Sequence, residues 1–375
     1  MMYVAIRIIL YNKVRFLVTL LGLVFAIGLI FSQMGIFLGL VENASVIIDH
    51  TPGDIWITSK NCKNFDFSQP FPEYIYYHAR SVEGIQWAEK VIIAWAMIKQ
   101  EEGGTEQVEV IGYNPDTGIG GPWQMRVGDA RAVKNGNFAI VDESAMKRLG
   151  NIKVGQYREV LPRRLQIVGI SKGIRSFTTA PFIFTSYSEA QKLVGYVGTD
   201  QTVFIIAKVL PGYSSTKVIQ DLKERLHGVD IYPKEEFSWK TRKYWTIETG
   251  VGFSFLFTIL ISFFIGMLIV GQTIYNSTVE HIKEFGTLKA LGATNREIYK
   301  IIFSQAFISA LLGYLVSLVV TIVSARFYEV IGMAMVVRGW VNLTVLLLTF
   351  LMCLSAAFVS IRKIKRIDPA ILFRG

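Results

Sequence analysis

Four long runs of the chain carry no Asp, Glu, Lys or Arg: residues 16–41, 249–279, 301–325 and 339–361. About 20 apolar residues in a helix are enough to cross the hydrocarbon core of a bilayer. Each run is therefore predicted to be a membrane-spanning helix. As a helix, the run 249–279 would be about 46 Å long, more than the roughly 30 Å core. We therefore expect the second span, taken as 246–279, to project beyond the bilayer as a stalk.

Residues 42–245 have the mixed pattern of a water-soluble domain. Runs of β-branched and aromatic residues predict strands at 54–58, 91–99, 107–112, 138–141, 165–170, 181–185 and 202–209. Capping residues predict three helices: 143–149 after Asp142, 190–194 after the capping box of Ser186 and Glu189, and one from Ser215 to Gly228. The predicted fold is therefore an α-helical membrane protein with four transmembrane helices plus an α+β extracytoplasmic domain.

Residues 1–15 place apolar side chains at helical spacing, which predicts an amphipathic helix on the cytoplasmic leaflet. A secretory signal peptide is the alternative interpretation. The uncharged run that follows is 26 residues long and has no Ala-x-Ala cleavage site after it, which favours an uncleaved anchor.

A charged segment, 280–294, separates the second and third uncharged runs, and the third span is taken as 295–325. In this segment Gly286 allows a bend and Gly292 can end a helical turn. Thr294 and Glu297 predict a capping box at the start of the next helix. We call residues 280–294 the elbow, and expect it to leave the membrane as a short helix on the cytoplasmic side and re-enter.

The net charge of +10 is concentrated at the expected cytoplasmic ends. Residues 1–15 carry a net +3, 276–300 a net +1 and the basic tail 362–375 a net +4. An excess of Lys and Arg marks cytoplasmic segments, and anionic lipid is the expected neighbour. We therefore expect both termini in the cytoplasm, a short external loop at 326–338, a fourth span at 339–361, and no binding of nucleic acid.

The chain shows no sequence pattern typical of a catalytic or metal site. Its two cysteines, Cys62 and Cys353, fall in the domain and in the last span, so they are not expected to pair. The four histidines have no metal-ligand spacing, and no Gly-x-x-x-x-Gly-Lys-Ser/Thr phosphate-binding loop occurs. We expect a non-catalytic chain with no cofactor of its own.

The elbow resembles the coupling helix of FtsX-like, MacB-like ABC transporter permeases, through the run from Glu280 to Thr294. The tail, with its basic residues before Asp368-Pro369, is similar to the ends of that family too. Within the family, Tyr244-Trp245, Gly250-Val-Gly252 and Gly112-Tyr-Asn-Pro-Asp116 are most similar to DevC-type permeases. The resemblance implies a mechanotransmission permease of the cell inner membrane with a periplasmic domain, and a separate ATPase subunit that binds ATP and Mg.

The resemblance also implies partners and site residues. The expected partners are an ABC ATPase, a second copy of this chain, a membrane-fusion protein and a TolC-like outer-membrane channel, with a lipid, glycolipid or other hydrophobic molecule as exported substrate. A non-transporting FtsX-like regulator of cell-wall hydrolases and a lipoprotein-extracting permease remain alternatives. The expected ATPase-coupling residues are Glu280, His281, Lys283, Glu284, Phe285, Gly286, Thr287, Leu288, Lys289, Leu291, Gly292 and Thr294.

Two further expectations come from residue type alone. Phe285, Leu288 and Leu291 are apolar in a segment flanked by water, so they are expected to be exposed and to enter a groove in the ATPase. Packing against the protein's own first helix is the alternative. Small residues allow close helix contact in lipid, which makes these glycines candidates for a dimer seam: Gly22, Gly28, Gly252, Gly266 and Gly271.

Overall fold

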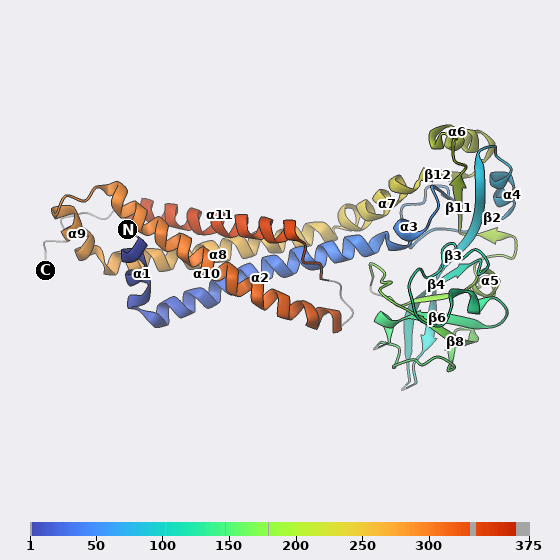
Figure 1. The fold of residues 1–375 in the computed structure, drawn as a ribbon, viewed down its shortest axis with the longest axis horizontal. Helices are drawn as coiled ribbons and strands as arrows, with labels where there is room; N and C mark the ends of the chain where they lie inside the picture. The colour runs from blue at the N-terminus through green and yellow to red at the C-terminus, as the bar shows by residue number, and fades with distance from the viewer. Residues whose placement is uncertain (1, 102, 147, 179, 331–334, 365–375) are drawn as a thin grey trace. The chain divides into compact units, whose positions relative to one another are not determined.

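The computed structural model describes residues 2–101, 103–146, 148–178, 180–330 and 335–364. The chain divides into two compact units. Unit 1 combines the residues up to Gly39 with those from Gly252 onward, and unit 2 is Leu40–Val251. Figure 1 shows long helices in unit 1 and a β-sheet with short helices in unit 2. Parts of the predicted external loop (331–334) and of the basic tail (365–375) lie outside the described residues.

Unit 1 is built from helices that lie side by side (Figure 1). They are α1 (Met2–Tyr11), α2 (Lys13–Ala44, whose end belongs to unit 2), α8 (Val251–Glu280), α9 (Ile282–Ala290), α10 (Asn295–Val330) and α11 (Gly339–Ile364). Within the described residues, four of these helices, α2, α8, α10 and α11, are long and apolar enough to span a membrane. A buried cluster of side chains from all four, which includes Leu23, Val270, Ala306 and Met352, holds them together.

Unit 2 contains a large mixed sheet. Some neighbouring strands are consecutive in the chain, such as β3 and β4, and others are far apart, such as β1 and β11. In the part of the chain that is described, the sheet has ten strands in the order β12-β1-β11-β3-β4-β9-β6-β8-β5, with β7 paired to β3 and β8. Most neighbours are antiparallel, but β4–β9 and β6–β8 are parallel. The strands are β1 (Ile55–Ser59), β3 (Ile85–Lys99), β4 (Thr105–Tyr113), β5 (Met125–Val127), β6 (Phe138–Asp142), β7 (Tyr157–Val160), β8 (Arg163–Ser171), β9 (Phe182–Ser186), β11 (Phe204–Val209) and β12 (Val229–Pro233), and a separate pair joins β2 (Phe71–Pro72) to β10 (Gln201–Thr202).

Short helices cover this sheet and complete the α+β domain. They are α3 (Val46–His50), α4 (Tyr74–Arg80), α5 (Tyr187–Leu193), α6 (Ser215–Arg225) and α7 (Lys234–Lys243), with 3-10 turns η1 (Ala130–Val133) and η2 (Glu143–Ala145) and a π-helical turn η3 (Tyr244–Glu248). The apolar face of α6, with Val218, Ile219 and Leu222, is buried as its spacing requires. Four spanning helices and an α+β domain confirm the predicted fold class.

Two local expectations differ from the structure. Of the predicted helix 143–149, the described residues form a single 3-10 turn at Glu143–Ala145, and residue 147 lies outside the described residues. The Asp142 carboxylate accepts from Ser144 N, Ser171 Oγ and Ile174 N. The second span does not continue unbroken from residue 246. Gly250 has a left-handed φ of +75°, which ends the helical segment α7–η3 before α8 begins.

Candidate functional site

The elbow forms a short helix between two spans. Helix α8 ends at Glu280, His281 lies at the turn, and α9 runs from Ile282 to Ala290. Gly292 ends it with a φ of +96°, and the backbone N–H of Ala293 bonds to the carbonyl of Leu288 at 2.9 Å. A left-handed glycine after a helix closes the last turn in this way. Gly292 therefore ends this helix, as the sequence predicts.

The predicted capping box at the start of α10 is only half formed. The backbone N–H of Thr294 donates to Glu297 Oε2 at 2.7 Å, as the box requires. The Thr294 hydroxyl donates to the same oxygen at 3.1 Å. The hydroxyl is therefore oriented toward the Glu297 side chain and does not accept from the backbone N–H of Glu297. That N–H instead donates to the carbonyl of Thr294.

The expectation that Phe285 is exposed is wrong. Its side chain is only 6% exposed and belongs to the buried cluster that includes Ala5 of α1 and Ile298 and Ile301 of α10. Leu288 packs against the same cluster and is partly buried. Leu291 is 80% exposed, as expected. The apolar face of α9 thus anchors the elbow to its own bundle, which is the alternative that the sequence left open.

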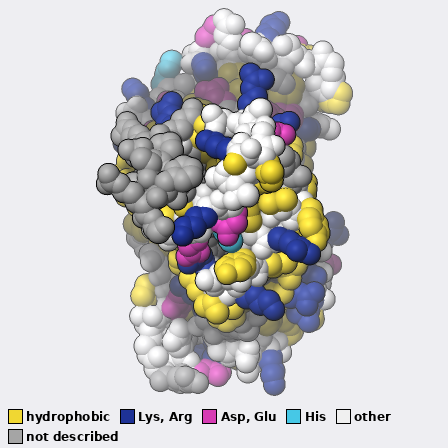
Figure 2. All heavy atoms as spheres, turned by 90° about the vertical axis from the view of Figure 1, so that its left-hand side faces the viewer, with side chains coloured by type: hydrophobic (Ala, Val, Ile, Leu, Met, Phe, Trp, Pro, Cys, Tyr) yellow, Lys and Arg dark blue, Asp and Glu magenta, His cyan; other side chains and the backbone are white. Residues whose placement is uncertain are grey.

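The outward face of the elbow is polar with one large apolar side chain. Lys283, Glu284, Thr287 and Lys289 are exposed along with Leu291, while Gly286 is half-buried. Figure 2 shows Lys and Arg side chains among hydrophobic ones on the face of unit 1 that carries α9. The accessible surface of the elbow is therefore this set of side chains together with Glu280, Ala290, Gly292 and Thr294, which are exposed too.

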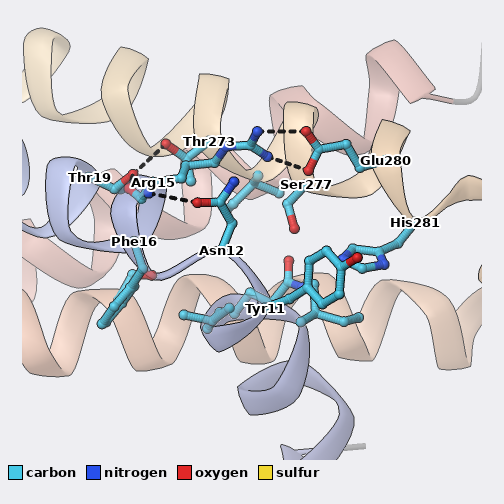
Figure 3. Close-up of a pocket in the computed structure, with 14 residues that line it drawn as sticks. Tyr11, Asn12, Arg15, Phe16, Thr19, Thr273, Ser277, Glu280 and His281 are labelled. Carbon is cyan, nitrogen blue, oxygen red and sulfur yellow. Dashed lines mark hydrogen bonds and ion pairs between the residues drawn. The ribbon is translucent and has the colours of Figure 1, made fainter.

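An ion pair connects the elbow to the start of the first span (Figure 3). The Arg15 guanidinium donates to both oxygens of Glu280, at 2.5 and 2.6 Å, although the residues are 265 positions apart. A bidentate pair of this kind fixes orientation as well as distance. One turn further into the bundle, the hydroxyls of Thr19 and Thr273 bond at 2.8 Å. Helices α2 and α8 are therefore joined near Arg15 and Glu280 by two polar contacts.

A small cavity lies beside this ion pair. It has a volume of about 40 Å³, and its lining includes Asn12, Arg15, Ser277, His281 and Gln305. Figure 3 shows the ring of Tyr11 next to His281, and the two rings meet edge to face with centroids 5.2 Å apart. The buried Gln305 Oε1 has no hydrogen-bond partner among the described residues. A cavity of this size holds a few water molecules and no larger substrate.

Two of the five glycines proposed for a dimer seam are closely packed inside the chain. A Cβ on Gly22 would lie 2.9 Å from Ile269, and a Cβ on Gly266 would lie 2.3 Å from Met352. Gly28 faces Ser317, and Gly271 faces Ala356. Packing within the bundle therefore accounts for Gly22 and Gly266, whereas a Cβ on Gly28 or Gly271 would make only ordinary contacts, at 3.5 and 3.8 Å. Gly252 is partly exposed at the start of α8.

Sequence reasoning missed the role of Arg15, although a signal was present. Arg15 directly precedes the first uncharged run, and Glu280 directly follows the second. Two opposite charges at the same edge of the membrane are natural partners. Both cysteines are buried and free, and within the described ranges no group of three or more His, Cys, Asp or Glu side chains could hold a metal ion.

Comparisons with known proteins match both halves of the chain. The model of the MacB-like periplasmic core domain matches residues 16–225, and the model of the FtsX-like permease C-terminal matches residues 255–369. An uncharacterized ABC transporter permease of Mycobacterium tuberculosis is 25% identical over 380 residues, covering both chains in full. Another from Methanocaldococcus jannaschii is 27% identical over 236 residues, covering 60% of this chain and 58% of the relative.

Among solved structures, the periplasmic region of MacB from Actinobacillus actinomycetemcomitans is similar to this chain. The match has a TM-score of 0.40 and 13% sequence identity, and it covers 50% of this chain and 92% of that one.

Proposed function

Because the chain belongs to the family of ABC transporter permeases with a MacB-like periplasmic core domain and an FtsX-like C-terminal region, we propose that it transmits the energy of ATP hydrolysis to its external domain. An ABC permease implies an ATPase partner. In this proposal the ATPase binds ATP and Mg and docks on the elbow, and the permease is non-catalytic. The movement drives export of a lipid, glycolipid or other hydrophobic substrate through a membrane-fusion protein and a TolC-like channel, as in DevC-type systems.

The anchored elbow is the observation that carries the proposal. A helix that is fixed on one side by Phe285 and by the Arg15–Glu280 pair can pass a push from a partner into α8 and α10. A freely mobile loop would absorb the same push. Docking then uses the exposed side chains, with Leu291 as the apolar contact and Lys283, Glu284 and Lys289 as a polar rim that fixes register.

We also propose a homodimer, with both termini in the cytoplasm and the domain 42–245 outside it. The four apolar helices and the periplasmic core domain indicate an inner-membrane, multi-pass protein. Of the spanning helices in the described part of the chain, α8 is covered least by its own bundle. In its most apolar 18-residue segment 17% is buried, against 33%, 33% and 44% in the corresponding segments of α2, α10 and α11. This uncovered face of α8 is our candidate for the dimer seam.

Replacing Leu291 by Asp tests the proposed coupling. The side chain is exposed, so the variant should fold and insert normally while losing most of its stimulation of the co-expressed cognate ATPase. Thr287→Asp on the same face should act in the same direction. Phe285 and Leu288 are unsuitable for this test because their replacement also disturbs the bundle.

The matched control is Leu210→Asp, an exposed leucine in unit 2. Binding and stimulation of the ATPase should be unchanged in this variant. Full stimulation of the ATPase by the Leu291→Asp, Thr287→Asp double variant would exclude the elbow as the coupling element.

A further inference from the structure

Two carboxyl groups are buried next to each other inside unit 2. Asp66 lies in the loop between β1 and β2 and is 6% exposed, and Glu109 lies on β4 and is fully buried. Each of the two carboxyl groups is among the groups that shift the pKa of the other. No N–H or O–H group of the described residues donates to either oxygen of Glu109. A buried carboxylate without a donor or a cation is strongly disfavoured.

Among the described residues, no cation is one of the groups that shift the pKa of either carboxyl. Opposite Glu109 in the sheet are Trp95 of β3 and Phe182 of β9. The phenol of Tyr196 is the other ionisable group near Glu109, and burial raises its pKa, so it is neutral near pH 7. Within the described residues, the ionisable groups that act on the pair are therefore all acids. At least one of the two carboxyls must keep its proton.

Asp66 also holds the segment that leads into α8. Its Oδ2 accepts a hydrogen bond of 2.7 Å from the indole N–H of Trp245, and its backbone carbonyl accepts one of 3.1 Å from Trp95. The Trp245 ring stacks on Phe177 with centroids 4.3 Å apart. Trp245 belongs to η3, which is followed by the left-handed Gly250 and then by α8. The indole is thus held directly before the glycine that separates η3 from α8.

We propose that Asp66 and Glu109 form a proton-binding site that holds Trp245 in place, so that loss of a proton loosens η3. The ligand of this site is the proton itself. The pair lies beside Trp95 and Trp245, and none of the described residues pairs with it as a counter-cation, so ionising it favours a conformation in which water reaches Asp66. Moving Trp245 away admits that water.

Linkage gives the direction of the effect. Burial raises the pKa of Asp66 to about 6, although the bond from Trp245 acts in the opposite direction. Burial, and then the neighbouring Asp66, raises the pKa of Glu109 well above its ordinary value. Water would return Asp66 to its ordinary pKa of about 4, so the docked conformation binds the proton more tightly and is favoured by acid. Release of Trp245 should become about tenfold more favourable between pH 5 and pH 7.5.

Infrared spectroscopy of the full-length protein in nanodiscs tests the proton directly. At pH 7.5 exposed carboxyl groups are ionised, so a protonated-carboxyl band must come from a buried acid. We expect this band in the unmodified protein and its loss in Glu109→Gln. Absence of the band from the unmodified protein would overturn the proposal, whether or not the variant folds.

Hydrogen–deuterium exchange of residues 240–250 tests the hold on Trp245. After correction for intrinsic rates, exchange should rise about tenfold from pH 5 to pH 7.5, and Asp66→Asn should abolish this rise because its amide oxygen still accepts from the indole without titrating. Asp116→Asn, an exposed acid paired with Lys134, is the control and should keep the rise. The proposal would be refuted if exchange in the unmodified protein did not depend on pH, or if Asp66→Asn kept the full rise in exchange.

A role for this site in setting how movement reaches the external domain rests on the proposed function. Both measurements need only the permease and its protons. Their failure would leave docking of an ATPase on the elbow untouched, and failure of docking would leave the proton site standing.

Discussion

Arg15 and Glu280 show how a single pair of side chains can define the geometry of the candidate site. Each closes one end of an apolar helix, and together they fix α2 to α8 immediately before the elbow. Phe285 also fixes the elbow, because its ring is buried in the core of the bundle. The sequence shows that Phe285 is apolar, but it does not show which face of a nine-residue helix meets the bundle. That choice depends on Ala5 and Ile298, which are far away in the chain.

Charge reversal at both positions measures how much the Arg15–Glu280 ion pair contributes to the stability of the permease. Arg15→Glu and Glu280→Arg should each lower the unfolding temperature of the permease, and the double variant should recover most of the loss. Both side chains are partly exposed, so we expect a coupling free energy of about 1 kcal/mol from a double-mutant cycle. The same cycle on Lys99–Glu159, an exposed pair in unit 2, should give a smaller value. A double variant no more stable than the worse single variant would contradict this role.

At the scale of elements, the sequence predicts the type of most segments and misplaces several of their ends. The strand expected at 91–99 begins at Ile85, because Trp87 and Ala88 also pair with β11. Helix α4 was not predicted. Its tyrosines at 74, 76 and 77 have no strong helix propensity, and packing of Ile75 and Ala79 against the core of unit 2 determines its conformation. Long-range contacts of this kind cannot be read from local patterns.

The glycines of α8 provide a test of helix packing. A Cβ at position 266 would approach the buried Met352 to 2.3 Å and Ala26 to 3.2 Å, whereas a Cβ at 271 would meet its nearest neighbour, Ala356, at 3.8 Å. Gly266→Ala should therefore destabilise the bundle by about 1–3 kcal/mol, and Gly271→Ala by less than about 0.5 kcal/mol. Thermal unfolding in detergent compares them under identical conditions. Equal stability of the two variants would contradict close packing of α8 against α11 at Gly266.

At the scale of the whole molecule, the sequence was most informative about class and least informative about mechanism. Uncharged runs and the placement of basic residues predict four spans and an external domain because the bilayer imposes strict limits on length and charge. The residues 16–225 and 255–369 then match two family models that together cover both units. The buried pair of Asp66 and Glu109 could not be predicted, since a turn residue and a strand residue meet only after the sheet has formed.

Site-specific photocross-linking from position 291 in native membranes tests the central claim most directly. The Leu291 side chain points away from its own bundle, so a photoreactive residue there should form an adduct with the ATPase subunit. The same residue at position 210 of the external domain should form no such adduct. An adduct with the ATPase from position 291 alone is the predicted result. Absence of an adduct from 291, or equal adducts from both positions, would contradict coupling through the elbow.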